Sequence, residues 1–178
     1  GTASGSILDA SGSGAINFTN TGAMGFNAQT GTRTLTLTGT NAGANTLAAI
    51  IADNGGATSV TKTGAGQWVV TGASTYTGGL TVSAGTMATG ATGSFGGGNI
   101  TFTSGTLTLG NAASIADSAT LSFASASIPL INLSFVGTEV LFGLSDASQG
   151  GLSIGDGTYS ADDLNNFFDS VIFLGDGY

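Results

Sequence analysis

The chain lacks the two side chains that most often carry catalysis and metal binding near neutral pH. Its 178 residues include no cysteine and no histidine. Without cysteine there can be no disulfide bond, no thiolate metal site and no cysteine nucleophile. Without histidine the commonest general base and metal ligand are missing, and a nucleophilic triad in its usual form is excluded. We therefore predict a protein that is not an enzyme, with no catalytic residue, no metal site and no cofactor.

Basic side chains are almost absent too. Arg33 and Lys62 are the only cations, against ten acids, which gives a formal net charge of −8. Nucleic-acid binding needs a basic surface that neutralises phosphates, so nucleic acid is excluded as a partner. The acids are unevenly placed, because residues 1–116 are neutral overall whereas residues 117–178 contain eight acids and no base. This asymmetry predicts a neutral body and an acidic C-terminal region.

Long apolar runs are missing as well, since no stretch approaches the ~18 apolar residues of a membrane-spanning helix. No charged start is followed by an apolar segment, so we expect any signal peptide to have been removed.

What the chain does contain is glycine, at 32 positions, and hydrophobic residues, which make up 40% of it. Disordered chains are rich in charge and poor in β-branched and aromatic residues. This chain has 7% charged residues and shows the reverse pattern, so we conclude that it folds.

Apolar residues recur in triplets about 20 residues apart, with a small polar residue usually in the middle. The triplets are Ile16-x-Phe18, Leu35-x-Leu37, Val60-x-Lys62, Leu80-x-Val82, Ile100-x-Phe102 and Leu121-x-Phe123. Their alternation is typical of half-buried strands. A second series keeps the same period and comprises Gly66-Gln67-Trp68, Gly85-Thr86-Met87 and Gly105-Thr106-Leu107.

A fixed period near 20 residues indicates a stack of coils, because one coil of that length cannot bury its apolar face alone. We predict an all-β protein, a parallel β-helix or β-solenoid, with its repeat body over residues 1–127. The interval of 25 residues between Leu35 and Val60 contains an insertion, and we expect the apolar segment 45–51 within it to be a strand.

The pattern changes after Pro129, and residues 128–178 are predicted to be a C-terminal cap or assembly region. Ser160 can serve as the N-cap of one short helix over 161–169, whose apolar face would contain Leu164, Phe167 and Phe168. Residues 171–174 return to a strand pattern. A cap is expected because the last coil of a solenoid otherwise exposes unpaired backbone groups.

The segment 59–86 resembles the autotransporter-associated β-strand repeat. The matching residues are Lys62, Thr63, Gly64, Ala65 and Gly66 in its opening, Tyr76, Gly78 and Gly79 in its turn, and Val82, Ala84, Gly85 and Thr86 in its close. Gln67-Trp68 and Ser74 depart from the usual pattern. The resemblance covers about 28 of the 178 residues. It implies a right-handed parallel β-helix that is exported by a Gram-negative-type bacterium and displayed extracellularly at the cell surface, and it does not imply an enzyme.

We expect a structural protein that associates with itself end to end into a fibre or surface layer, because a solenoid has two sheet-like ends. The residues predicted for this contact are Ile7, Leu8, Phe167, Phe168, Val171, Ile172, Phe173 and Leu174. One alternative is an adhesin that binds surface glycans through Trp68, Tyr76 or the glycine-rich loop 90–98. Another is an ice-binding protein that uses rows of outward threonines (Thr34, Thr36, Thr38, Thr101, Thr103, Thr106 and Thr108).

Two further kinds of site were weighed. Hydrolysis of a glycan would need paired carboxylates, for which Asp9, Asp53 and Asp117 are the candidates in the body, but they fall on separate predicted coils. Calcium takes oxygen ligands alone and could bind the acidic turns around Asp156 and Asp176. We favour the reading of these turns as solvated surface.

Overall fold

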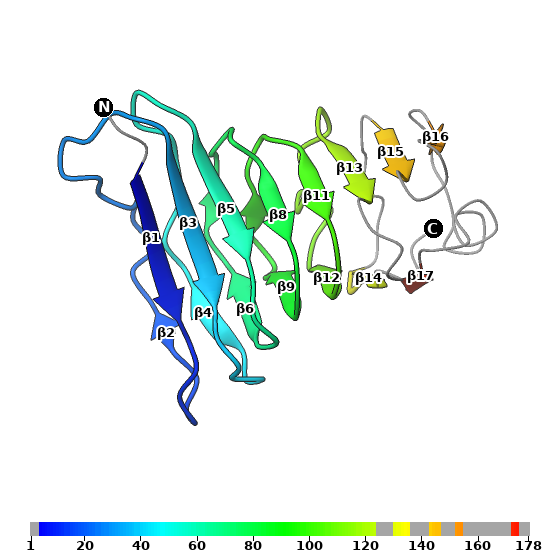
Figure 1. The fold of residues 1–178 in the computed structure, drawn as a ribbon, viewed down its shortest axis with the longest axis horizontal. Helices are drawn as coiled ribbons and strands as arrows, with labels where there is room; N and C mark the ends of the chain where they lie inside the picture. The colour runs from blue at the N-terminus through cyan, green and yellow to red at the C-terminus, as the bar shows by residue number, and fades with distance from the viewer. Residues whose placement is uncertain (1–3, 124–129, 136–142, 147–151, 155–171, 175–178) are drawn as a thin grey trace.

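The computed structural model describes residues 4–123, 130–135, 143–146, 152–154 and 172–174, and it shows a β-solenoid (Figure 1). Within these ranges the regular elements are strands and no helix is present. Two long sheets run along the molecule, and the N-terminal coil forms one end of it (Figure 1). The predicted fold class is confirmed.

The first sheet has eight strands, and every neighbouring pair is parallel except the last. In spatial order its strands are β1 (Ser4–Asp9), β3 (Arg33–Thr38), β5 (Thr58–Lys62), β8 (Leu80–Val82), β11 (Ile100–Phe102), β13 (Thr120–Phe123), β15 (Gly143–Asp146) and β16 (Leu152–Ile154). Apart from β15 and β16, successive strands of this sheet are separated in sequence by strands of the other sheets. This is the arrangement of a chain that winds around one axis.

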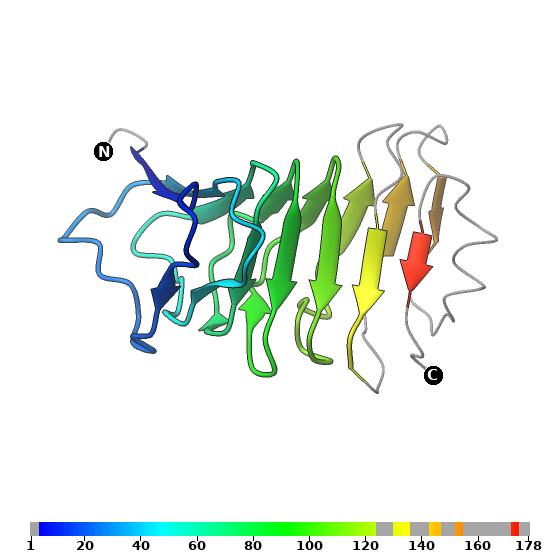
Figure 2. The same cartoon turned by 90° about the horizontal axis from the view of Figure 1, so that it is seen from below.

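The second sheet has seven strands, all parallel. Its strands, again in spatial order, are β17 (Ile172–Leu174), β14 (Leu130–Leu133), β12 (Thr106–Leu109), β9 (Thr86–Thr89), β6 (Gln67–Val70), β4 (Asn45–Leu47) and β2 (Asn17–Phe18). They lie side by side along the length of the molecule (Figure 2). A short third sheet pairs β10 (Ser94–Phe95) with β7 (Ala73–Ser74).

The predicted column of apolar side chains is present in the first sheet. Val60 is paired with Leu80, Leu80 with Ile100, and Ile100 with Leu121. All four side chains are buried, and they alternate with half-buried hydroxyl residues that point outward. The interior is therefore shared between successive coils, as the period required.

The second series of the sequence is confirmed as an inward column of the second sheet. Trp68 is paired with Met87, and Met87 with Leu107, and all three side chains are buried. Each coil thus contributes one stretch to each long sheet.

One member of the first series was assigned to the wrong sheet. Ile16-x-Phe18 belongs to β2, which is paired with β4 in the second sheet. The residues of the first coil that extend the column of the first sheet are Ser6 and Leu8, opposite Leu35 and Leu37. Spacing alone could not assign the first coil, because β1 and β2 are separated by only a short loop and both have an alternating pattern of apolar residues.

Of the segment 45–51, which was predicted to be a strand, only residues 45–47 form one, β4, and this strand keeps regular parallel pairing with β6. It is therefore the normal second-sheet strand of its coil. The additional residues of this coil lie in the connections at 39–44 and 48–57, so the lengthened interval leaves the register of both sheets intact.

Strand pairing continues beyond residue 127. β14 and β15 extend the two sheets in parallel, and β17 adds to β14, which confirms the strand predicted at 171–174. β16 pairs with β15 in antiparallel fashion. The predicted helix over 161–169 lies outside the described residues, and the division of the chain at 127 stays a prediction.

Glycine occupies one corner of successive coils for a steric reason. Gly64 and Gly85 both have positive φ, at 69° and 67°. A Cβ atom on Gly85 would lie 2.4 Å from the carbonyl oxygen of Gly64 in the coil below, and one on Gly64 would lie 2.6 Å from that of Gly39. Backbones approach so closely at this corner that a side chain cannot be accommodated.

Candidate binding site at the N-terminal coil

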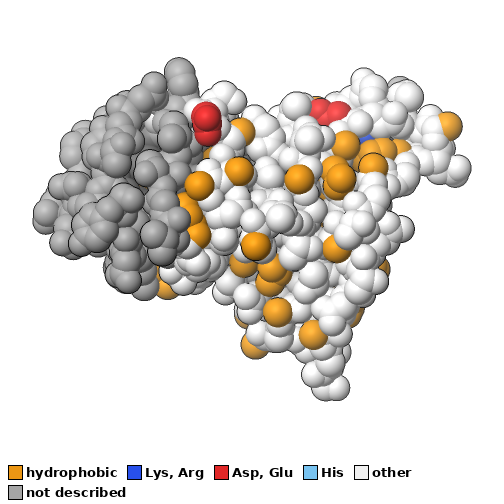
Figure 3. Space-filling model, turned by 180° about the vertical axis from the view of Figure 1, so that it is seen from behind, with side chains coloured by type: hydrophobic (Ala, Val, Ile, Leu, Met, Phe, Trp, Pro, Cys, Tyr) orange, Lys and Arg blue, Asp and Glu red, His pale blue; other side chains and the backbone are white. Residues whose placement is uncertain are grey.

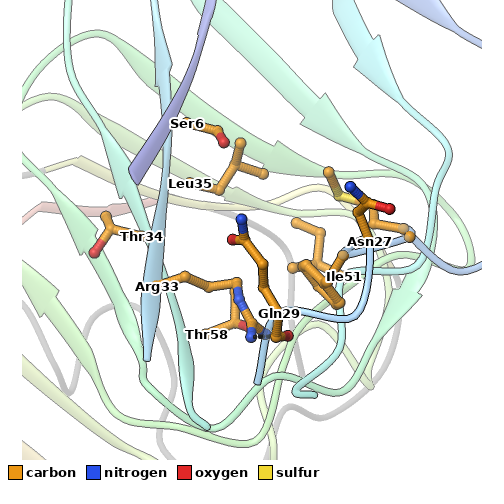
Figure 4. A pocket seen from close by; sticks show the side chains of 11 residues that line it. Ser6, Asn27, Gln29, Arg33, Thr34, Leu35, Ile51 and Thr58 are labelled. Carbon is orange, nitrogen blue, oxygen red and sulfur yellow. Dashed lines mark hydrogen bonds between the residues drawn. The ribbon is translucent and has the colours of Figure 1, made fainter. Parts of the chain in front are cut away.

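A cavity of about 260 Å³ lies between the first sheet and the connection 19–32 (Figure 4). The connection contributes one wall, and β1, β3, Ile51 and Thr58 contribute the rest. The lining residues are Ser6, Met24, Gly25, Phe26, Asn27, Gln29, Arg33, Thr34, Leu35, Ile51 and Thr58. The lining includes both apolar and polar side chains, and no acid is among them.

Arg33 is the charged residue of this cavity, and its side chain extends from β3 towards Gln29 and Thr58 (Figure 4). It is 9% exposed. Its Nη1 donates to Thr58 Oγ1 at 3.3 Å, and its Nη2 donates to the carbonyl oxygens of Gln29 at 2.9 Å and Asn54 at 3.2 Å. The guanidinium carbon lies 4.1 Å from the centroid of the Phe26 ring, a cation–π contact.

The shape of the connection depends on a tight turn beneath Phe26. The Gln29 amide donates to the carbonyl oxygen of Phe26 at 2.9 Å. Asn27 and Ala28 within this turn have φ of 47° and 62°, and they are the described non-glycine residues in the left-handed region. Asparagine tolerates this conformation, but alanine does so at a cost. Such strain persists only where surrounding contacts impose it, and it is commonest at functional sites.

Asp53 lies close enough to Arg33 to be influenced by its charge but is engaged elsewhere. It accepts hydrogen bonds from the Thr58 amide at 2.7 Å, the Thr77 amide at 3.2 Å and the Thr77 hydroxyl at 2.6 Å. Burial opposes ionisation of Asp53. The bonds from Thr77 and Thr58, aided by the Arg33 charge, outweigh that effect and hold its pKa below its ordinary value. Asp53 thus connects two successive coils through these hydrogen bonds.

The edge strands of the N-terminal coil expose apolar side chains. Ile7 on β1 is 68% exposed and Phe18 on β2 is 39% exposed, and these are the exposed large hydrophobic residues of the described chain. The Phe18 ring stacks on Trp68 with centroids 6.4 Å apart. Leu8, also predicted at this contact, is half-buried against the core. Self-association at this end stays a prediction.

The remaining residues predicted for self-association belong to the C-terminal region. Phe167, Phe168 and Val171 lie outside the described residues. Ile172, Phe173 and Leu174 form β17, whose backbone pairs with β14.

Trp68 and Tyr76 are core residues. Each is 1% exposed, so neither can be a stacking platform for a sugar, and that part of the adhesin hypothesis is wrong. The indole Nε1 of Trp68 donates to the carbonyl oxygen of Thr38 at 2.9 Å. Burial raises the pKa of Tyr76 far above its ordinary value. The loop 90–98 is partly exposed, but Phe95 within it is buried.

The candidate carboxylates of the body have separate partners. Asp9 accepts a hydrogen bond from the Ser11 hydroxyl, whereas Asp53 is held by Thr58 and Thr77. In the part of the chain that the structure describes, no three acidic side chains gather as metal ligands would. The predicted calcium turns around Asp156 and Asp176 lie outside that part.

Outward hydroxyl residues form a continuous row on the first sheet. Thr36, Thr61, Thr81, Thr101 and Ser122 occupy equivalent positions on five successive strands. Ile7 stands at the N-terminal end of the same row. On the second sheet the row is interrupted, since Thr108 is paired with Ala88. The lengthened coil leaves the first row unbroken.

The surface of the described residues carries little charge. Figure 3 shows the face opposite to that in Figure 1, on which their apolar side chains are scattered among polar ones and their acidic side chains are sparse. Scattered apolar residues of this kind are normal for a soluble surface and do not form a large patch.

The cavity was missed by sequence reasoning, which treated Arg33 only as one of two cations. Phe26, Gln29 and Arg33 show no motif spacing, and the turn that brings them together depends on left-handed conformations of Asn27 and Ala28. The signal that could have indicated a site was an isolated cation in a chain with almost none.

Comparison with known proteins gives one family and one relative. Residues 60–88 match the passenger-associated-transport-repeat family. The chain is 42% identical over 90 residues to a protein of Brucella suis biovar 1 (strain 1330) named adhesin BmaC autotransporter. That alignment covers 50% of this chain and 3% of the relative, so the chain spans a small fraction of its length. No solved structure matches the chain. No helix among the described residues is long and apolar enough to cross a membrane.

Proposed function

We propose that this chain, which carries an autotransporter-associated repeat, is part of a secreted or surface-exposed passenger of a Gram-negative bacterium and acts in adhesion. The observation that carries the proposal is the fit between the repeat and the coil. Residues 60–88 begin in β5 and end in β9, and so comprise one complete coil with an overlap into the next. Val60 is paired with strands on both sides, and so is Met87.

A coil that is paired on both edges is a unit that can be stacked into a rigid rod. Such a rod holds its outward side chains and corner connections at fixed positions, which suits display of a binding surface. Its interior is filled by packed side chains, so ligands are expected at corner connections and at exposed faces, where loops usually carry function. The relative named as an adhesin supports this reading.

A non-catalytic role is supported by the chemistry of the side chains. Histidine and cysteine are absent from the whole sequence. The two acids near the N-terminal coil, Asp9 and Asp53, are engaged with different partners. Passenger repeats and β-solenoids are typically non-catalytic, and we extend that property to this chain.

Adhesion is tested with beads that carry the purified chain, incubated with cultured epithelial cells and with immobilised extracellular-matrix extract. We expect retention of the beads well above that of beads carrying a variant with an unfolded solenoid, Ile100→Asp. Equal retention of the two, or retention no higher than that of uncoated beads, contradicts an adhesive role.

A second candidate function, end-to-end self-association, is favoured by Ile7 and Phe18, which expose apolar surface on strands whose outer edges are unpaired among the described residues. Added strands can supply main-chain hydrogen bonds at such an edge.

A third candidate function, ice binding, rests on the hydroxyl row from Thr36 to Ser122, whose members repeat at the ~4.8 Å spacing of strands. Thermal hysteresis in dilute solution would support it, and its absence would remove it.

A further inference from the structure

The guanidinium at the base of the N-terminal cavity has more donors than partners. Arg33 has five N–H groups, and its three hydrogen bonds to Thr58, Gln29 and Asn54 use Nη1 and Nη2. The Nε–H group and one Nη1–H group are left over. A buried donor without a partner is costly, and the cost is recovered when a ligand supplies the acceptor.

The charge of Arg33 is also left without a direct counter-ion in the described part of the chain. The nearest influence is Asp53, whose carboxylate is already held by Thr58 and Thr77. The cavity lining contains no acid, so the nearest negative charge to an incoming anion is Asp53, outside the lining. In a concave site an attraction of this kind is stronger than at a flat, open surface.

The walls combine apolar and hydrogen-bonding groups in the way that sugar-ring sites do. Phe26, Met24 and Ile51 offer apolar contact, whereas Ser6 offers a hydroxyl. Both Nη2–H groups are already used, so a carboxylate on Arg33 would accept a single charge-assisted hydrogen bond, from Nε–H or from Nη1–H. The volume of about 260 Å³ is at the lower end for ligand pockets, so the cavity has room for a single ring.

We propose that this cavity binds an acidic monosaccharide, with the carboxylate on Arg33 and the ring against Phe26. The inference rests on the proposed adhesive function and deepens it by naming the class of ligand. The strained turn at Asn27 and Ala28 has a role in this arrangement, because it places Phe26 over the guanidinium.

The test compares two sugars that differ at one carbon. Galacturonate carries a carboxylate where galactose carries a hydroxymethyl group, and acetate carries the carboxylate alone. Binding to the whole chain is measured by isothermal titration calorimetry and by NMR chemical shifts at pH 7. We expect galacturonate to bind at least tenfold more tightly than either galactose or acetate, and we expect its affinity to fall as salt is raised.

Two variants assign the binding to the cavity. Arg33→Gln should weaken galacturonate at least tenfold and abolish its preference over galactose. Phe26→Leu keeps the side chain apolar and should weaken the binding of galacturonate several-fold. Thr101→Val, far from the cavity, is the control and should leave this affinity unchanged. If Arg33→Gln does not melt cooperatively, it is not informative. The test then rests on the affinities of galacturonate and galactose for the native chain and for Phe26→Leu.

The proposal is overturned if galacturonate does not bind, if galactose binds equally well, or if Phe26→Leu and a folded Arg33→Gln bind like the native chain. Beads that adhere to cells while the cavity fails to bind galacturonate would remove this inference and leave the adhesive role standing. Beads that do not adhere, with galacturonate still bound at Arg33, would remove the adhesive role and leave the site.

Discussion

Lys62 and Ala84 connect two successive coils, since the Lys62 ammonium donates to the carbonyl oxygen of Ala84 at 3.0 Å. The same ammonium donates to the carbonyl oxygens of Thr63 and Gly64, each at 2.8 Å. Lys62 is fully buried in an inward column, between Leu37 and Val82. Its methylene groups replace an apolar side chain, and its charged end satisfies the carbonyl groups of a corner.

This burial predicts an unusual dependence of stability on pH. Burial lowers the pKa of Lys62 from 10.5 to about 8. Between these values the unfolded chain binds a proton that the folded chain has lost, so the free energy of unfolding rises with pH. We therefore expect chemical denaturation to give a higher unfolding free energy at pH 9.5 than at pH 7.5.

The control is Lys62→Met, which should remove most of this rise. A native chain whose stability is flat or falls between pH 7.5 and 9.5 would contradict the assignment. Above pH 10 stability should fall, because Tyr76 ionises in the unfolded chain but its raised pKa keeps it neutral in the fold.

The glycine corner predicts that the substitution of glycine by alanine destabilises the fold at Gly85 but has little effect on stability at Gly97. Gly85→Ala places a Cβ atom 2.4 Å from the carbonyl oxygen of Gly64 and does so at positive φ, so we expect a loss of at least about 2 kcal/mol in unfolding free energy. Gly97→Ala meets nothing within 4 Å and should change stability by less than about 0.5 kcal/mol. Similar melting curves for the two variants would argue against close backbone contact between coils.

The shared interior predicts that inward and outward positions on one strand respond differently to charge. Ile100→Asp buries a carboxylate between Leu80 and Leu121, and we expect cooperative unfolding with a loss above about 4 kcal/mol. Thr101→Asp puts the same carboxylate on the outer face and should cost about 1 kcal/mol or less. Circular dichroism during thermal melting measures both, and equal melting temperatures would refute the inward assignment.

End-to-end association is tested at the edge of the first coil. If copies associate through β1, the sedimentation coefficient of the native chain should rise with concentration, and electron micrographs should show short fibres. Ile7→Lys puts a charge on the exposed edge strand and should shift the association at least tenfold towards higher concentration. Thr81→Lys, in the same outward row but within the stack, should not. A native chain that stays monomeric at millimolar concentration would rule this function out.

The sequence predicted the stack because period and alternation are properties of the chain itself. Val60, Leu80, Ile100 and Leu121 could be aligned without coordinates, since each coil repeats the same inward positions. The first coil could not be aligned, because Phe18 and Leu8 alternate equally well and only their pairing distinguishes the two sheets. Irregular elements give no period by which to place them.

The candidate site depended on features that no pattern reports. Phe26 comes to lie over Arg33 only because two residues adopt left-handed conformations, and such a turn without glycine has no sequence marker. Lys62 was identified as part of the repeat opening, but a lysine at an inward position is normally counted as exposed. Its three carbonyl partners come from corners that only the stacked structure brings together.

Parallel stacking also determines how the molecule should respond to a mechanical pull. Val60, Leu80 and Ile100 follow one another at intervals of 20 residues, yet neighbouring strands stand only ~4.8 Å apart. A coil that peels from the end under tension would release ~66 Å of extended chain, at ~3.3 Å for each residue. Each coil is held by two ladders, so we expect a chain pulled from one end to give way in a series of small ruptures, each of which absorbs work before the next coil is loaded.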